Sequence, residues 1–133
     1  MQRDIVDMYL VGTDRNTKSG DVCIKMGIYL KSLTAHDNSV PFYICAPSAF
    51  MDYSIDDGLK EIPVKMHSGH KVRHSPGRTN AGEIAEVNIL PAGSSAGNDA
   101  FDVTPAAFVS ALVAGLFFAD ASRVGITAMF PER

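Results

Sequence analysis

The chain has 133 residues, of which 46% are hydrophobic and 20% charged, so it has the size and composition of one globular domain with a sizeable core. Its net charge of −3 excludes a general electrostatic attraction to nucleic acid or to an anionic membrane surface. Met1–Asp7 contains three charged residues and no apolar run precedes them. We therefore expect no signal peptide and a cytoplasmic protein.

A strand followed by a helix is the first predicted unit. Ile5–Val11 is almost wholly apolar, as in a strand that is buried on both faces of a parallel sheet. After a polar turn, one apolar stripe has helical spacing, with its members at Val22, Met26, Tyr29 and Leu33. We expect Ser19 or Asp21 to cap this helix and His36–Asn38 to end it. Asp14 then lies beyond the carboxyl end of the strand, where ligands bind in open α/β sheets.

Val40–Ala46 is predicted to form a second buried strand. A strand, a helix and a parallel strand complete a βαβ unit, so the predicted fold class is α/β, with a mostly parallel, Rossmann-like sheet flanked by helices. We expect residues 1–133 to form a single domain of this class. Cys23 and Cys45 fall in the predicted helix and strand, and we expect both thiols to be free and buried.

The second half of the chain gives weaker signals. Thr104 followed by Pro105 is a typical helix start, and we expect that helix to run to about Phe118. The other predicted elements are a loop or short helix at Ser48–Asp57, strands at Glu61–Lys65, Ile84–Leu90 and Val124–Met129, and loop over most of 67–97.

Three histidines, His67, His70 and His74, form the pattern H-x2-H-x3-H in a segment rich in lysine and arginine. Imidazoles at such spacing can converge on a metal ion. No cysteine or carboxylate accompanies them in the pattern, and the segment is predicted to be mostly loop. We therefore interpret these histidines as solvated side chains and expect no metal site.

Several motifs, which together cover about half of the chain, resemble one family. The segments VGTDR and GDVCIKMGIY are similar to VGADR and NGDxANKxGTY of the methylthioribose-1-phosphate isomerases. VPFYICAP is similar to that family's IPFYVAAP, and NDAFDVTP to its NPAFDVTP. The same superfamily contains the ribose-1,5-bisphosphate isomerases and the regulatory subunits of translation initiation factor 2B. The resemblance is to the C-terminal, Rossmann-like part of these proteins.

The resemblance implies roles for individual residues. Asp14 matches the family's catalytic aspartate, the group that would accept and return a proton during aldose–ketose isomerisation. Lys25 matches a phosphate ligand near a helix start, and Gly20 and Asp21 shape the same corner. From the residues alone, the alternatives are that Asp14 pairs with Arg15 or caps a turn, and that Lys25 is a solvated helix lysine.

The implied function is conversion of methylthioribose 1-phosphate to methylthioribulose 1-phosphate in methionine salvage, without a cofactor and in a homodimer. The implied partners are a phosphorylated sugar and a second copy, with no nucleic acid and no membrane. The family's catalytic cysteine lies upstream of the segment that matches Asp4, so we expect the isolated chain to be inactive. The alternatives are a ribose-1,5-bisphosphate isomerase or a regulatory module of the initiation factor 2B type. Ile24, and Lys65-Met66-His67 where the family has acidic residues, depart from the isomerase pattern.

Overall fold

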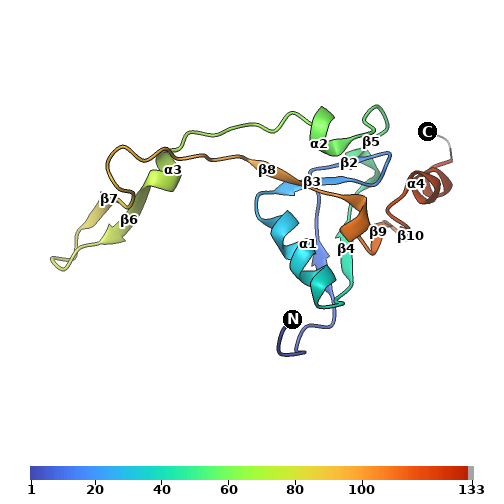
Figure 1. Ribbon diagram of the computed structural model, residues 1–133, viewed down its shortest axis with the longest axis horizontal. Helices are drawn as coiled ribbons and strands as arrows, with labels where there is room; N and C mark the ends of the chain where they lie inside the picture. Colours follow the sequence, from blue (N-terminus) through green and yellow to red (C-terminus); the bar gives the residue numbers. More distant parts are fainter. Residues whose placement is uncertain (132–133) are drawn as a thin grey trace. The chain divides into compact units, whose positions relative to one another are not determined.

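A computed structural model describes residues 1–131. These residues form two compact units: a main unit, made of Met1–Pro63 and the chain from Phe101 onward, and a hairpin unit, Val64–Ala100 (Figure 1). Among the described residues, no helix is both long and apolar enough to cross a membrane.

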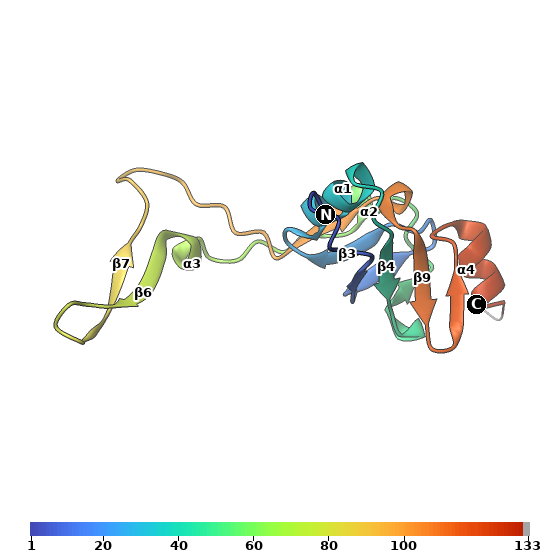
Figure 2. The ribbon, with the colours of Figure 1, turned by 90° about the horizontal axis from the view of Figure 1, so that it is seen from below.

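The first sheet of the main unit has the strand order β1-β4-β9-β10. Its members are β1 (Tyr9–Val11), β4 (Phe42–Cys45), β9 (Ala111–Ala114) and β10 (Phe117–Ala119). β4 pairs in parallel with both β1 and β9, while β10 turns back antiparallel to β9. Figure 2 shows β4 and β9 as neighbouring arrows that point the same way. The parallel pairing of β1 and β4 confirms the predicted strand–helix–strand unit.

The second sheet of the main unit has the order β5-β2-β3-β8. Its members are β5 (Met51–Asp52), β2 (Arg15–Thr17), β3 (Val22–Lys25) and β8 (Phe101–Thr104). β3 is antiparallel to both β2 and β8, and β2 is parallel to β5. This sheet carries the segment after β1 that contains the predicted site.

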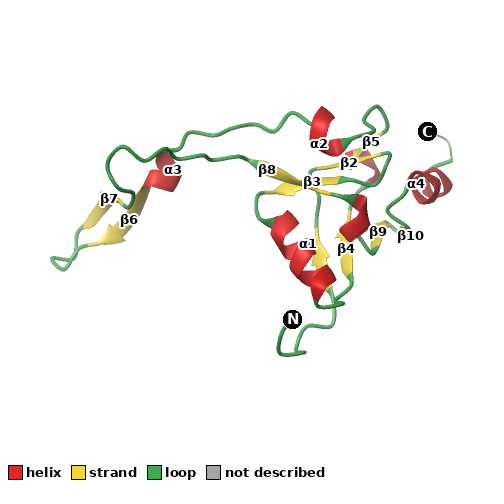
Figure 3. Cartoon of the chain, in the orientation of Figure 1, coloured by secondary structure: helices red, strands yellow, loops and turns green. Residues whose placement is uncertain are grey.

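Helices cover the two sheets, as the predicted α/β class requires (Figure 3). α1 (Ile28–Asp37) packs against β4 and β8, and α4 (Arg123–Met129) packs against β10. The remaining helical segments are short: η1 (Ser48–Phe50), α2 (Gly58–Glu61) and η2 (Ala106–Phe108).

The main core lies between the first sheet, α1 and α4, and its largest fully buried apolar side chains are Phe42, Ile44, Leu112 and Ile126. A smaller apolar cluster covers the other face of β3 and β8 and contains Cys23, Ile55, Ile62 and Val103. Alternate residues of β3 therefore enter different clusters, with Val22 and Ile24 in the main core and Cys23 in the smaller one. This burial on both faces fixes β3 in the main unit.

The hairpin unit contains α3 (His70–Arg73) and two antiparallel strands, β6 (His74–Arg78) and β7 (Ile84–Asn88). A turn closes the hairpin through the Thr79 N–H, which donates to the Glu83 carbonyl at 2.8 Å. β7 confirms the strand predicted at Ile84–Leu90.

Lys25 does not lie in a helix, so the helix predicted from Asp21 is wrong in its first part. Val22–Lys25 is a strand with partners on both sides, and α1 begins only after Gly27, whose φ of 96° departs from the helical region. The apolar stripe is equally compatible with a strand buried on both faces, so its period did not distinguish the two structures. The predicted helix end is confirmed, because Asn38 is the C-cap of α1.

Other elements also differ from expectation. Thr104 ends β8 instead of starting a helix, because Phe101–Thr104 pairs with β3, and two strands follow where the long helix was predicted. Val124–Met129 belongs to helix α4, and Glu61 ends helix α2 where a strand was predicted. These segments are short, so tertiary pairing outweighs their local preferences.

The burial of β1 and β4 is also lower than predicted. Leu10, in the middle of β1, is 57% exposed, so this strand is not buried on both faces. Both cysteines are free as predicted, but only Cys23 is buried, and Cys45 at the end of β4 is exposed.

Candidate active site

Asp14 lies on the rim of a cavity in the main unit. The loop Gly12–Asp14 leaves the carboxyl end of β1 and leads into β2. The cavity has a volume of about 290 Å³ and is lined by Asp14, Arg15 and residues 49–53. An acidic and a basic residue therefore line the same cavity.

Short polar contacts hold this loop against β3. The Asp14 N–H donates to the Cys23 carbonyl oxygen at 3.0 Å. The Thr13 hydroxyl lies 2.9 Å from Oδ1 of Asn16 and 3.2 Å from the Cys23 carbonyl oxygen. Asn16 is fully buried, and its side-chain amide donates to the sulfur of Met51. These contacts fix the backbone that carries Asp14 and leave its side chain outside the core.

The Asp14 carboxylate accepts no hydrogen bond and forms no ion pair within residues 1–131. Arg15 instead pairs with Asp52, with 3.3 Å between Nη1 and Oδ2. Hydrogen bonds from the Ser54 hydroxyl and backbone N–H, with a smaller effect of the Arg15 charge, hold the pKa of Asp52 below its usual range. The pairing of Asp14 with Arg15 that the sequence allowed is therefore not found.

Lys25 is exposed at the end of β3 and is not among the residues that line the Asp14 cavity. β2 and β3 pair Arg15 with Cys23 and Asn16 with Val22, and Lys25 lies two positions beyond Cys23 along β3. The side chain of Lys25 is thus open to solvent at the end of a strand and not at a helix start.

Asp102 occupies the start of α1. Its carboxylate accepts a hydrogen bond from the Gly27 N–H at 2.6 Å and lies 3.2 Å from the Tyr29 nitrogen. A protein carboxylate thus already interacts with the free N–H groups and the positive end of this helix dipole. Because the Asp102 carboxylate already accepts hydrogen bonds from these N–H groups, they are not free to bind a phosphate. Binding of a phosphate by Lys25 would therefore depend on the charge of the lysine and on other neighbouring groups.

Asp21 connects three segments of the main unit. Oδ1 accepts a hydrogen bond from the Ala106 N–H and Oδ2 accepts one from the Gly58 N–H, both at 3.0 Å. Gly20 precedes it with a φ of 100° and is packed against the backbone of Ala121. Both residues shape the corner between β2 and β3, and the Asp21 carboxylate does so through bonds to its own chain.

The two thiols are expected to differ in reactivity. Burial, followed by the negative charge of Asp14, raises the pKa of the Cys23 thiol, so less of the reactive thiolate forms at any given pH. Cys45 is exposed.

We expect a disulfide reagent such as Ellman's reagent at pH 8 to modify one thiol per native chain rapidly, and Cys45→Ser to remove this fast phase. Both thiols should react after unfolding, and two equally fast phases in the native protein would contradict the assignment.

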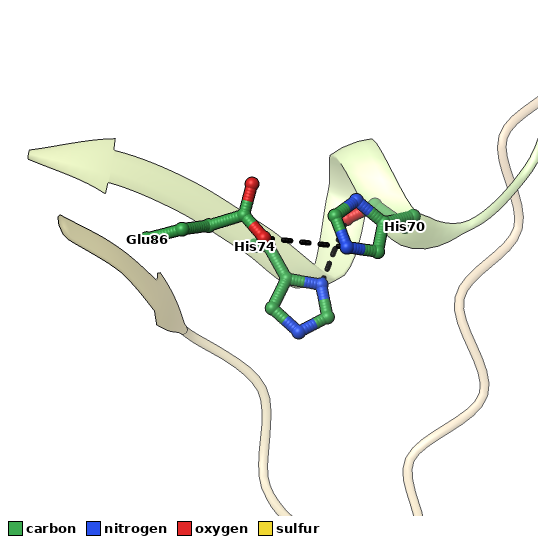
Figure 4. A group of neighbouring side chains, drawn as sticks. All are labelled: His70, His74 and Glu86. Atoms are coloured by element: carbon green, nitrogen blue, oxygen red, sulfur yellow. Dashed lines mark hydrogen bonds and ion pairs between the residues drawn. The ribbon is translucent and has the colours of Figure 1, made fainter.

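The three predicted histidines do not form one cluster. His70 and His74 lie together with Glu86, and one potential ligand atom from each residue is within 4.8 Å of the others (Figure 4). His67 is exposed outside this group. Glu86 was missed because it follows His74 by 12 positions and reaches the group only through the β6–β7 pairing.

Asp52 and Asp102 were also not predicted at their observed positions. Asp52 reaches the cavity from a two-residue strand, β5, and Asp102 reaches α1 from β8, more than seventy positions later in the chain. Only the NDAFDVTP motif, which contains Asp102, gave a sequence signal near this residue. The Asp52 contact has no local signal.

Known proteins similar to this chain agree on one family. A family model described as "Initiation factor 2 subunit family" matches residues 1–116. Among curated proteins, the methylthioribose-1-phosphate isomerases of Sinorhizobium medicae and Rhodospirillum rubrum are 50% and 47% identical over the whole chain. The alignments cover 36% and 34% of those proteins, so the chain spans about a third of their length.

Solved structures show the same relationship. The 5-methylthioribose 1-phosphate isomerase of Pyrococcus horikoshii OT3 matches 99% of this chain and 34% of its own, with a TM-score of 0.82 and 27% identity. The delta subunit of translation initiation factor eIF-2B from A. fulgidus matches 96% of this chain and 34% of its own, with a TM-score of 0.78 and 26% identity. With a family model over most of its length, the chain belongs to the initiation factor 2 subunit family.

Proposed function

We propose that this chain forms the Asp14-bearing part of an enzyme that converts methylthioribose 1-phosphate to methylthioribulose 1-phosphate. The observation that carries the proposal is sequence identity: over all 133 residues, the chain is 50% identical to two proteins that are named for this activity. The exposed, unpaired carboxylate of Asp14 on the rim of a polar cavity supports it. No cofactor is part of the proposal.

Asp14 is the proposed acid/base. Aldose–ketose isomerisation moves hydrogen between adjacent carbons, which requires a group that takes a proton from the sugar and returns it. A carboxylate without a protein partner is free to approach the substrate, and the Thr13 and Cys23 contacts hold its backbone in place. Arg15 lies on the same cavity and gives it a positive neighbour.

Lys25 is the proposed contact to the substrate phosphate. In a chimaera in which residues 1–133 replace the matching segment of the Sinorhizobium medicae isomerase, we expect Lys25→Ala to raise KM for methylthioribose 1-phosphate by about tenfold. The change in kcat should be small, as for loss of one charge-assisted hydrogen bond. Lys31→Ala, which removes an exposed lysine from α1, is the matched control and should leave KM unchanged. Equal kinetics of the two variants would exclude this role for Lys25.

Gly20 and Asp21 complete the proposed site by shaping the corner between β2 and β3. A cytoplasmic homodimer is also part of the proposal. Exposed apolar side chains at and beside β10, Leu116, Phe117 and Phe118, support a surface that a second copy covers.

A chimaera tests the proposed function directly. The segment of the Sinorhizobium medicae isomerase that matches this chain is replaced by residues 1–133, and turnover of methylthioribose 1-phosphate is followed by NMR. We expect turnover within about a hundredfold of the parent enzyme. A folded chimaera with no turnover above a buffer blank would refute the proposal.

The second candidate is a non-catalytic regulatory module. The structural match to an initiation factor subunit and the aliphatic Ile24 beside Lys25 favour it. The same chimaera separates the two functions, because a regulatory module would fold in that context without restoring turnover. A ribose-1,5-bisphosphate isomerase would be recognised by turnover of ribose 1,5-bisphosphate in the same assay.

A further inference from the structure

Three potential metal ligands converge in the hairpin unit, which contains none of the residues of the proposed isomerase site. They are His70 in α3, His74 at the start of β6 and Glu86 in β7. One nitrogen or carboxylate oxygen from each lies within 4.8 Å of those of the other two. Figure 4 shows the two imidazoles facing each other, with the Glu86 carboxylate directed at the His70 ring.

The local fold explains why these residues meet. In β6–β7 the register pairs Pro76 with Glu86 and His74 with Asn88, so His74 and Glu86 project from the same face of the ribbon. α3 ends immediately before His74 and places His70 one turn earlier, on the side of this face. The two rings stack with centroids 4.1 Å apart. Three separate elements therefore supply one ligand each.

The contacts among His70, His74 and Glu86 are compatible with a bound cation. Nε2 of His70 lies 3.3 Å from Oε1 of Glu86, a distance that a bound ion would replace by two shorter coordination bonds. Nδ1 of His74 lies 3.2 Å from the His70 carbonyl oxygen, which only accepts hydrogen bonds, so Nδ1 carries the proton in this contact. An ion bound at Nδ1 would take the place of this proton and its hydrogen bond, and the ring would keep its one proton on Nε2. About half of the His70 and Glu86 side chains is exposed, which leaves room for water as a further ligand.

We propose that His70, His74 and Glu86 bind a divalent transition-metal ion, with Zn²⁺ as the best match. Two imidazoles and one carboxylate form a ligand set used by zinc sites that keep an open position for water. Mg²⁺ and Ca²⁺ prefer oxygen ligands alone, so this set selects against them. The ion joins α3 to both strands of the hairpin, and the site is independent of Asp14.

Titration of the purified chain with ZnCl₂ by calorimetry tests the proposal. All measurements use a Cys45→Ser background, because the exposed Cys45 thiol is a competing zinc ligand. We expect one ion per chain, no heat with MgCl₂, and NMR shift changes of amides centred on the three ligands. CoCl₂ should give a visible absorption band of a nitrogen- and oxygen-ligated ion.

Matched variants assign the ligands. His74→Ala and Glu86→Gln should each weaken Zn²⁺ binding by about tenfold or more. His67→Ala and Glu83→Gln, which remove the same groups from exposed positions outside the cluster, should leave the affinity within about twofold. His70→Gln provides a second test if His74→Ala perturbs the hairpin. An unchanged affinity in folded ligand variants, or a loss in the control variants, would overturn the assignment.

Discussion

Replacing Asp14 by asparagine is expected to reduce kcat of the chimaeric isomerase by about a thousandfold, with KM within a factor of about three. Removal of a general acid/base costs roughly 10²–10⁴ in rate, while asparagine keeps the shape of the side chain that contacts the sugar. In this structure, the substitution should affect catalysis without affecting folding. The Asp14 carboxylate forms no bond within the described residues, so the substitution breaks no contact that stabilises the fold.

Stability measurements separate this chemical effect from misfolding. Thermal melts of the variant should match those of the parent, since exposed substitutions usually change the free energy of unfolding by less than about 0.5 kcal/mol. Asp7→Asn, at another exposed aspartate of the same segment, is the matched control and should retain full turnover. An Asp14→Asn chimaera that keeps its kcat would remove Asp14 from the mechanism, whatever its stability.

The site loop was predicted from the sequence because its signals are local. An apolar run followed by Asp14 and a polar turn is enough to place a carboxylate beyond the end of a strand, and β1 and the loop confirm that placement. The position of Lys25 was not predictable in the same way. The apolar residues of its segment fit both the helical and the strand period. The segment is a strand because it pairs with β8, almost eighty positions later.

Charges that reach a site from distant segments remained undetected for the same reason. Asp52 pairs with Arg15 from β5, and Glu86 meets His70 across a hairpin. Neither contact has a spacing pattern, because it depends on strand register and not on helical or strand periodicity. The prediction that the histidines lack a carboxylate partner failed for this reason: the partner is far in sequence and near in space.

Gly20→Ala is expected to lower the free energy of unfolding by roughly 3 kcal/mol or more, the largest stability effect expected in the main unit. Two costs add at this position. A β-carbon on Gly20 would have to accept a φ of 100° and would overlap with the backbone carbonyl of Ala121, while approaching Cβ of Ala106 to 3.1 Å. Ala121 leads into α4, and Ile126 of that helix is buried in the main core. Relief of the overlap therefore requires a shift of the backbone at Ala121, two residues before α4 begins.

Variants of two other glycines separate the cost of the positive φ from the cost of the steric overlap. Gly27 has a φ of 96° but open space around its α-carbon, so Gly27→Ala carries only the backbone strain, about 1–2 kcal/mol. Gly12 has neither a positive φ nor a neighbour within 4 Å, so Gly12→Ala should be close to neutral. Urea unfolding of the three variants should give the order Gly20→Ala, Gly27→Ala, Gly12→Ala from most to least destabilised. If Gly20→Ala and Gly27→Ala lose equal stability, the contact with Ala121 contributes nothing and the corner at Gly20 and Asp21 is set by backbone conformation alone.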